Sequence, residues 1–480
     1  MPSSPLARLG LHRPELRAWA MYDWAVSAVQ TTIMVAVFPI YFVEIARTTL
    51  PASRATQALA TANTIAALIA AGASPILGAI SDYAGAKKRM LAGAMTVGVI
   101  AVAGMFFLHH GDATLALVLF VIALVGATLS VVFYEALLPR VARPDELDRV
   151  SSAGYALGYL GGGVLLALNL LWILKPAWFG LPAGPGLSES QATLPTRLAL
   201  LSVAVWWLVF SLPLFRKVPE PERLIEPDET PTRSTPAASA TLAATPPAGP
   251  TPAASLLTAH FARLGETFRT LRGFRQALLM LVAFMVYNDG IQTIQQMATA
   301  YGTEIGIGRG VLITAVLVVQ FVGVPFAFVF GALANRIGAK RAIFLGLFVY
   351  AGISVLGYFM RTATHFVILA MLVATVQGGT QALSRSLFAS LIPAHRSGEL
   401  FGLYSVFEKF ASIFGPLLFA VTIMLTGSSR NAILSVILFF ILGAALLARV
   451  EVAEGQRAAR AADEGLGVLP HNIEGAASAS

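Results

Sequence analysis

Residues 114–138 have the sequence TLALVLFVIALVGATLSVVFYEALL, an apolar run whose one charged residue is Glu135. A helix needs roughly 20 predominantly apolar residues to cross the hydrocarbon core of a bilayer. Backbone hydrogen bonding in lipid leaves only helices and closed barrels, and this run is too long and too uniformly apolar for a barrel strand. The stretch therefore predicts a transmembrane helix.

The composition of the 480-residue chain extends this prediction to the whole protein. Hydrophobic residues make up 56% and charged residues 12%, and the mean hydropathy is +0.74. A soluble domain carries about 25% charged residues, so lipid must cover this apolar surface. The chain has no cysteine, which excludes disulfides and thiolate metal sites. Its seven histidines lack metal-binding spacing, so we expect no metal or other cofactor.

Comparable apolar runs occur in two sets of six, separated by a polar stretch. We expect an all-α polytopic membrane protein with twelve transmembrane helices in two pseudo-symmetric bundles, the first over 20–215 and the second over 276–450. The predicted spans are 20–45, 58–80, 90–108, 114–138, 150–174 and 197–215, then 276–300, 310–334, 341–360, 364–390, 400–426 and 430–449.

The remaining segments are polar. Residues 1–19 form the N-terminal segment, and we expect no cleavable signal peptide, because the apolar run that follows is too long. The linker over 216–275 is expected to be partly disordered, since its centre is rich in Pro, Ala, Thr and Glu. Within it, 256–272 has apolar residues at helical spacing, typical of an amphipathic surface helix. The tail over 451–480 is expected to be disordered.

The Lys and Arg residues indicate the orientation. Most of the 33 fall in the alternate segments that share a side with the N-terminus. Because cytoplasmic loops carry the excess of Lys and Arg, we expect both termini in the cytoplasm, in a bacterial inner membrane. This topology signal accounts for the net charge of +8, so we expect no nucleic-acid binding.

Two loops at equivalent places in the two bundles have related sequences. Residues 78–89 are GAISDYAGAKKR and residues 331–341 are GALANRIGAKR. Spans 1 and 7 also share a motif, with Tyr22 before Asp23 and Tyr287 before Asn288 and Asp289. Parallel repeats of this kind favour a solute site at the interface of the two halves.

Both loops resemble the signature loop of the major facilitator superfamily, G-x-x-x-D-[RK]-x-G-[RK]-[RK]. They depart from it at Tyr83, Ala86, Asn335 and Ala339. In that superfamily the loop holds the inward gate closed. A solvated basic loop would account for the Lys and Arg residues, but not for the glycines that occur as pairs in both halves. The residues that this resemblance assigns to a cytoplasmic gate, with Glu135 as a gate or loop partner, are Gly78, Asp82, Gly85, Lys87, Lys88, Arg89, Asn335, Arg336, Gly338, Lys340 and Arg341.

Further segments resemble one branch of the superfamily, the "unknown major facilitator" family. Its eukaryotic relatives are autophagy-linked proteins implicated in vacuolar amino-acid efflux, so the resemblance implies a transporter, with amino acids as a candidate substrate. The matching segments are 22–27 (YDWAVS), 149–163 (RVSSAGYALGYLGGG), 287–293 (YNDGIQT), 379–386 (GTQALSRS) and 401–404 (FGLY) through Lys409 to Gly415 and Pro416.

Asp289 is the strongest candidate for a functional side chain. It lies near the middle of span 7, and Gln292, Thr293 and Gln296 follow on the same helical face. An ionisable group at this depth either serves transport, as a proton site or substrate ligand, or pairs with another charge such as Arg385 or Lys409.

Span 1 and span 10 supply further candidates for substrate or proton binding. Asp23 lies nearer the cytoplasmic end, where its aromatic neighbours could equally be interfacial belt residues. Arg385 follows Gln377 and Gln381 at successive steps of four, and its guanidinium suits a substrate carboxylate or neutralises a nearby acid.

Glu408 and Lys409 are adjacent in span 11 and point about 100° apart, so one can face the cavity while the other faces a neighbouring helix. Together with the residues above, they complete the candidate set for substrate or proton binding.

These observations favour a secondary active transporter that moves a small solute by alternating access. The chain has no G-x-x-x-x-G-K-[ST] phosphate loop, and intramembrane carboxylates favour proton coupling. An amino acid or a related zwitterion or anion is the expected solute, and a monomer in membrane lipid the expected state. The alternatives are a non-transporting receptor or a membrane enzyme, but we expect no enzyme, because no span pairs a nucleophile with a base.

Overall fold

The computed structural model describes residues 11–84, 86–142, 147–220, 268–393 and 411–464, with a few single positions between 400 and 408. Helices and short turns make up these residues, and no strand is found among them. Most of the predicted linker over 216–275 lies outside the described residues, as do Gly85 and Lys409. The side chains of Asp82 and Asn335 also lie outside the description.

The first group of helices contains the six spans predicted for the N-terminal half. One continuous rod is made of α2, a π-helical stretch η1 and α3, and each later span is one long helix. The bounds are α2 Pro14–Ala28, η1 Val29–Ala36, α3 Val37–Ala46, α4 Ala52–Ala84, α5 Lys87–Gly104, α6 Ala113–Val141, α7 Leu147–Leu174 and α8 Glu189–Lys217, with short 3-10 turns at Met105–Phe107 and Pro176–Phe179.

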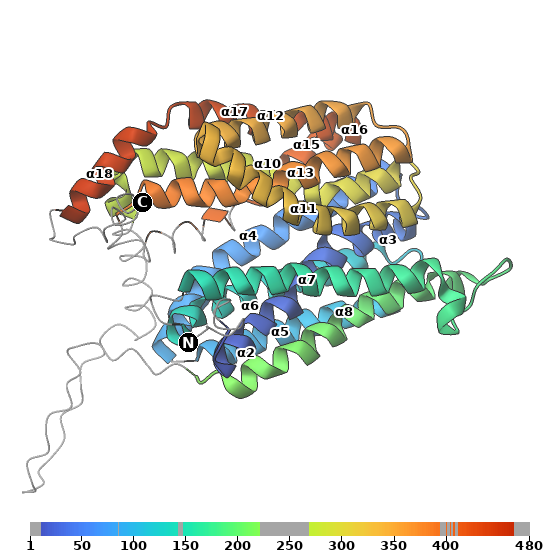
Figure 1. Ribbon diagram of the computed structural model, residues 1–480. Coiled ribbons are helices and arrows are strands. Elements are labelled where there is room, and N and C mark those ends of the chain that lie inside the picture. Colours follow the sequence, from blue (N-terminus) through green and yellow to red (C-terminus); the bar gives the residue numbers. More distant parts are fainter. Residues whose placement is uncertain are drawn as a thin grey trace, which may run out of the picture.

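The second group repeats this pattern. Its described elements are α10 Arg275–Glu304, α11 Arg309–Ile337, α12 Ala339–Tyr358, α13 Ala363–Ser390, α15 Phe414–Thr426, α16 Ser429–Ser435, α17 Ile437–Ala448 and α18 Val452–Glu464. In Figure 1 the blue and green helices form one layer and the yellow to red helices a second layer, stacked with their axes roughly aligned.

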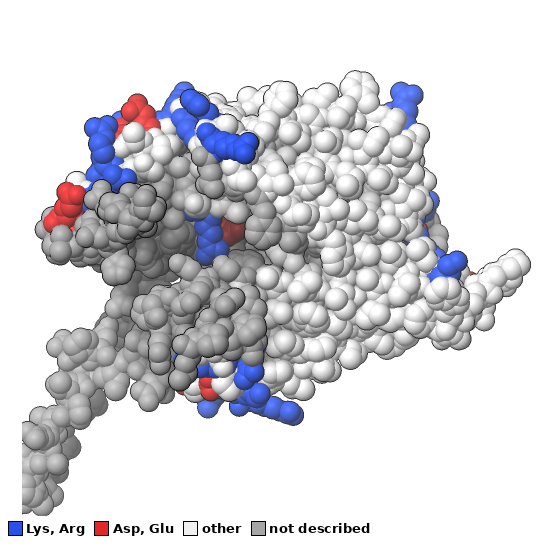
Figure 2. Space-filling view, viewed as in Figure 1, with Lys and Arg blue, Asp and Glu red and all other residues white. Residues whose placement is uncertain are grey.

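The helices have the length and composition of membrane spans. Ten of those described are long and apolar enough to cross a bilayer, and two shorter apolar helical stretches, Arg309–Gly323 and Phe414–Thr426, stand at the predicted spans 8 and 11. Figure 2 shows the matching surface, with an uncharged middle and with most of the visible charges at the two ends. The predicted all-α fold of apolar spans is confirmed.

The helix directions give the molecule two distinct ends. In Figure 1, α2 and α10 begin at the same side of the molecule where α8 and α17 finish. We call this end the terminal face, and the other end, where α3 and α10 finish, the opposite face.

Glycines allow the first span to lie against α7 at very short range. A Cβ atom added at Gly161 would overlap the Trp24 carbonyl and ring, and one added at Gly158 would come within 2.6 Å of Ser27 Oγ. A Cβ at Gly162 would come within 2.8 Å of Thr31. Small residues at this spacing permit close helix packing.

The chain beyond the last span differs in part from the disordered tail that we predicted. Residues Val452–Glu464 form helix α18, which packs against α10 and α13 at the terminal face. Its sequence is rich in alanine, the best helix former, and Gly455 lies against Gln276 and Leu391. Glu454 accepts a hydrogen bond of 2.7 Å from Gln276, so a short polar helix is tied to the second group.

Candidate functional site

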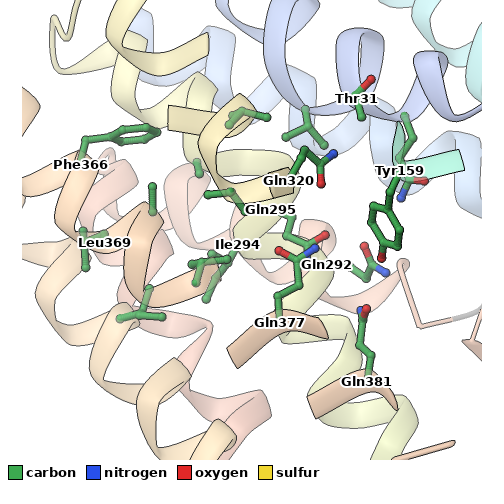
Figure 3. A pocket seen from close by; sticks show the side chains of 18 of the residues that line it. Thr31, Tyr159, Gln292, Ile294, Gln295, Gln320, Phe366, Leu369, Gln377 and Gln381 are labelled. Carbon is green, nitrogen blue, oxygen red and sulfur yellow. The ribbon is translucent and has the colours of Figure 1, made fainter. Parts of the chain in front are cut away.

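A cavity of about 250 Å³ lies between the two helix groups. The first span and α7 contribute its lining from the first group, and α10 to α13 contribute most of the rest. Figure 3 shows that side chains from several of these helices converge on it. The polar lining residues are Asp23, Ser27, Gln30, Thr31, Tyr159, Gln292, Gln295, Tyr301, Gln320, Gln377, Gln381 and Glu408.

The cavity has a polar and an apolar part. In Figure 3 the amide groups of Gln292, Gln377 and Gln381 lie close to the Tyr159 ring on one side of the view. The side chain of Phe366 lies on the other side, among aliphatic groups of the second group. A solute with both a polar group and an apolar group matches this division.

Asp23 lies at the contact between α2, α6 and α7. Its Oδ2 atom accepts a hydrogen bond of 3.4 Å from the Tyr134 hydroxyl, and Trp19 Nε1 donates to the Tyr134 carbonyl at 3.1 Å. A Cβ added at Gly154 would lie 3.0 Å from the same carboxylate. Glu135 lies close enough for its negative charge to repel that of Asp23. The carboxylate is thus held by α6 and α7, yet it still lines the cavity.

Asp289 is held by backbone groups of a neighbouring helix. It is 1% exposed and does not line the cavity. Its two carboxylate oxygens accept hydrogen bonds from the backbone N–H groups of Phe414 at 3.0 Å and Gly415 at 2.8 Å. These groups belong to the first residues of α15, where N–H donors lack partners within the helix and negative charge is favourable. Asp289 therefore joins α10 to the start of α15.

The residues next to Asp289 link α10 to α13. The Tyr287 hydroxyl lies 2.5 Å from the Ser384 hydroxyl, and Gln381 Nε2 donates to Asn288 Oδ1 at 3.3 Å. Asn288 is fully buried, and its Nδ2 atom has no hydrogen-bond partner within the described part of the chain. Since Gln381 lines the cavity, this pair connects the cavity wall to the core of the second group.

The predicted binding residues separate into those that line the cavity and those that do not. Asp23, Gln292, Gln377, Gln381 and Glu408 line it together. Asp289 and Gln296 are buried beside it. Arg385 is exposed on α13 and is not among the lining residues.

Several lining residues were missed by the sequence reasoning. They are Gln295, Gln320 and Tyr159. An uncharged amide inside an apolar span is the signal that could have found the two glutamines. Within the described residues, no group of three His, Asp or Glu side chains could hold a metal ion.

One lysine of each repeated loop binds the end of a helix in its own group. Lys88 Nζ donates to the carbonyls of Phe215 at 3.1 Å and Val218 at 2.5 Å, at the end of α8. Lys340 Nζ occupies the equivalent place in the second group, donating to the carbonyls of Ala448 at 2.9 Å and Val450 at 2.8 Å.

The other loop residues have separate positions. Lys87 Nζ lies 3.5 Å from the Ala136 carbonyl, beside Glu135. Arg89, Arg336 and Arg341 are exposed. Gly338 has φ +87°, a conformation that favours glycine, and it forms the turn between α11 and α12.

Among the described residues, the hydrogen bonds between the two groups lie mostly toward the opposite face. Arg47 donates to the Thr303 carbonyl at 2.7 Å, and the Thr56 hydroxyl donates to Glu304 at 2.6 Å. Arg309 Nη1 lies 3.5 Å from the Thr196 hydroxyl. Deeper in the molecule, Thr299 donates to the Val35 carbonyl of the π-helical stretch at 2.5 Å.

Comparison with known proteins identifies the family. The family model described as "Vacuole effluxer Atg22 like" matches residues 12–460. An uncharacterized MFS-type transporter of Bacillus subtilis is 35% identical over 434 residues, covering 90% of this chain and 94% of that protein. Autophagy-related protein 22 of Yarrowia lipolytica is 28% identical over 66% of this chain and 52% of its own length.

Solved structures support the same assignment of the fold. A D-xylose–proton symporter aligns with a TM-score of 0.60 and 14% identity over 94% of this chain and 99% of its own. A bacterial homologue of the human lysosomal transporter Spinster, in an inward-facing and unoccupied conformation, aligns with a TM-score of 0.58 and 13% identity over 96% and 98%. The chain therefore belongs to the vacuole effluxer Atg22-like family and is an MFS-type transporter, not an enzyme.

Proposed function

We propose that the protein is a proton-coupled secondary transporter that carries a small solute through the cavity between its two helix groups by alternating access. The observation that carries this proposal is that the cavity is lined by Asp23 from one group and by Glu408 from the other. A site built from both halves is reshaped when the halves move against each other, which is what alternating access requires.

We place the terminal face in the cytoplasm of a bacterial cell, with the protein acting as a monomer in the inner membrane. The concentration of Lys and Arg in the segments on the side of the termini supports this orientation. The hydrogen bonds between the groups then lie toward the outer side, so the cavity faces the cytoplasm in this conformation.

Asp23 is our candidate proton site. It lines the cavity, and the groups that face it are the hydroxyls of Tyr22, Tyr134 and Tyr159 and the carboxylate of Glu135. None of these four groups, which are the ones described around Asp23, is cationic, so a proton is the natural means of neutralising Asp23 when the cavity closes. Asp289 instead accepts two backbone hydrogen bonds, and we assign it the positioning of α15.

We propose an amino acid or a related small molecule as the solute. The resemblance to autophagy-linked efflux proteins supports this class, and the family model describes an effluxer. Gln292, Gln377 and Gln381 offer both hydrogen-bond donors and acceptors to such a solute. Arg385 lies outside the cavity lining, and we assign it to the path between the cavity and the terminal face.

The repeated loops form the proposed cytoplasmic gate. In the conformation described here, Lys88 and Lys340 each bind the end of the last span in their own group. Closing the terminal face would bring the two loops together, and the exposed Arg89, Arg336 and Arg341 are then available for contacts across the interface.

The test measures proton movement in liposomes that contain the purified protein and a pH-sensitive dye. Amino acids, dipeptides, sugars and organic acids are added one at a time to wild type, Asp23→Asn and Asp289→Asn. We expect proton flux with one solute class, lost in Asp23→Asn and retained in part in Asp289→Asn. Solute uptake that needs no pH gradient and survives Asp23→Asn would contradict proton coupling through Asp23.

A further inference from the structure

Amides make up much of the polar wall of the cavity. Half of the polar side chains described there belong to glutamines, which come from the first span, α10, α11 and α13: Gln30, Gln292, Gln295, Gln320, Gln377 and Gln381. A primary amide in apolar surroundings is unfavourable unless its N–H groups and its carbonyl are paired. The partners of these amides therefore indicate whether the fold or a ligand needs them.

Most of these amides have no partner in the described part of the protein. Gln381 Nε2 donates to Asn288 Oδ1 at 3.3 Å, which gives that amide a structural contact. By contrast, no hydrogen bond to another described residue is formed by the side chains of Gln30, Gln292, Gln320 and Gln377. Water can pair with these groups while the cavity is open to one side, but a cavity that closes around a solute loses this water. The solute must then supply the partners.

The positions of the amides define one region for this contact. In Figure 3, Gln292 of α10 and Gln377 of α13 extend into the space beside the Tyr159 ring, and Gln320 of α11 projects into the same cavity. Apolar side chains, among them Phe366, line the other side of the view. A small solute placed here has its polar groups against the amides and its carbon chain against the apolar wall.

The chemistry of an amide indicates which group it pairs with best. A primary amide both donates and accepts, so a carboxamide or a hydroxyl, which also do both, can satisfy its two ends. An ammonium group only donates, a carboxylate only accepts, and a hydrocarbon side chain does neither. An amino acid with an apolar side chain therefore leaves amides unpaired that a carboxamide or hydroxyl side chain would pair.

We propose that Gln292, Gln320 and Gln377 bind an uncharged carboxamide or hydroxyl group of the solute. The cavity then selects small solutes that carry such a group, and among amino acids it selects those with an amide or hydroxyl side chain. This inference rests on the proposed function, because it takes the cavity as the substrate site.

The first test compares amino acids of nearly equal size. Binding of glutamine and methionine, of asparagine and leucine, and of threonine and valine is measured by calorimetry on the purified full-length protein. We expect at least one polar amino acid to bind at least about tenfold more tightly than its apolar counterpart, because the counterpart leaves the amides unpaired. An apolar amino acid that binds more tightly than its polar counterpart, differences below about tenfold in every pair, or no binding of any of these amino acids would overturn the inference.

Variants separate ligand binding from folding. Gln292→Met and Gln377→Met each replace the amide with an apolar chain of similar length. We expect each to weaken binding of the preferred polar amino acid at least about tenfold, while the melting temperature stays at or above that of wild type, because an unpaired amide is removed from apolar surroundings. Gln456→Met is the matched control on α18, outside the cavity lining, and is expected to change neither.

Gln381→Met provides a contrast, because its amide has a partner in the protein. We expect this variant to lower the melting temperature, since it leaves the buried Asn288 without its hydrogen bond. Unchanged ligand binding in both Gln292→Met and Gln377→Met would overturn the inference. A melting temperature as low as that of Gln381→Met in both variants would assign their amides to the fold and would also overturn it.

The proposed function has a separate readout, because flux is measured in liposomes and ligand preference on the purified protein. Flux of a solute that is unchanged in Gln292→Met and Gln377→Met would support transport and overturn the amide site. Preferential binding of a polar amino acid without flux of any solute would contradict transport and support the amide site.

Discussion

A carboxylate buried in a membrane helix is stabilised by a partner of opposite charge, by a bound proton, or by hydrogen bonds from the protein itself. Asp289 is stabilised by hydrogen bonds, with one backbone N–H donor for each carboxylate oxygen. The donors come from the start of α15, where the helix dipole also favours a negative charge. Asp289 therefore connects α10 to α15, and we expect its replacement to lower the stability of the protein.

Replacing Asp289 with Ala is expected to lower the free energy of unfolding by about 1.5–3 kcal/mol, the range for hydrogen bonds to charged groups. Asp289→Asn keeps one acceptor oxygen and is expected to lose less than the alanine variant does. Thermal unfolding of the purified protein in detergent measures both. Equal stability of wild type and Asp289→Ala would show that the two backbone contacts contribute nothing.

Gly415 is expected to tolerate no side chain. A Cβ atom there would overlap the Thr293 hydroxyl and lie 2.7 Å from the Asp289 carboxylate, so Gly415→Ala must displace α15 from α10. We expect Gly415→Ala to reduce stability by about 1–3 kcal/mol, as overpacking does. Gly352→Ala is the matched control in α12, because open space surrounds its added Cβ. The same thermal unfolding assay should leave that control at or above wild type.

Single residues show how far sequence reasoning reached. Depth in an apolar span selected Asp289, charge selected Asp23, and helical spacing to Arg385 selected Gln377 and Gln381. The partners of Asp289 could not be predicted, because they are backbone groups 125 and 126 residues away with no side-chain signature. The sequence reasoning selected Arg385 because it is charged and did not select the uncharged Gln295. Of these two residues, only Gln295 lines the cavity.

Among the elements, the two repeated loops perform the same structural task in each group. Lys88 and Lys340 both donate to backbone carbonyls where the last span of the group ends, at α8 and at α17. Carbonyl groups at a helix end lack partners within the helix, and a cation there is favourable. The two loops thus make a similar helix-capping contact, although in the repeated sequence Lys340 aligns with Lys87 and not with Lys88.

Lys88→Met and Lys340→Met are expected to destabilise the protein by similar amounts, about 1–3 kcal/mol each, because each removes two charge-assisted hydrogen bonds. Arg89→Met is the control, since Arg89 is exposed in the same loop and is expected to change stability by less than about 0.5 kcal/mol. Chemical unfolding of the three variants is compared. A loss in only one of the two lysine variants would contradict the equivalence of the loops.

Element positions were largely predictable, because the apolar runs exceed the length that a bilayer demands. The predicted span 276–300 lies inside α10, Arg275–Glu304, and 364–390 lies inside α13, Ala363–Ser390. The π-helical stretch Val29–Ala36 was not predictable, because one extra residue per turn leaves no mark on hydropathy. Helix α18 was missed because its alanine-rich sequence is polar overall and only apolar runs were sought.

For the molecule as a whole, the hydrogen bonds between the two groups within the described residues lie mostly toward the opposite face. Arg47, Thr56 and Arg309 form hydrogen bonds across the interface toward the opposite face. A transporter that exposes its cavity alternately must break such contacts in one half of its cycle. The strength of these hydrogen bonds therefore sets the fraction of molecules that are open at the opposite face.

The bond between Thr56 and Glu304 isolates one such contact. Glu304 accepts a hydrogen bond of 2.6 Å from Thr56 of the first group and one of 2.6 Å from Ser429 of its own group. Thr56→Val removes the contact between groups at nearly constant volume, whereas Ser429→Ala removes the internal one. A charged hydrogen bond is worth about 1.5–3 kcal/mol, so Thr56→Val should raise the population open at the opposite face by a factor of roughly 10–150.

The absence of native cysteine makes this population measurable with two spin labels on the full-length protein. Cysteines introduced at Thr49 and Arg361, both exposed at the opposite face on different groups, report the separation by pulsed electron paramagnetic resonance. We expect a longer-distance population to grow in Thr56→Val, because its Glu304 no longer holds the first group. Ser429→Ala should keep the wild-type distance distribution. An equal shift in both variants would contradict the prediction that the Thr56 bond holds the two groups together at this face.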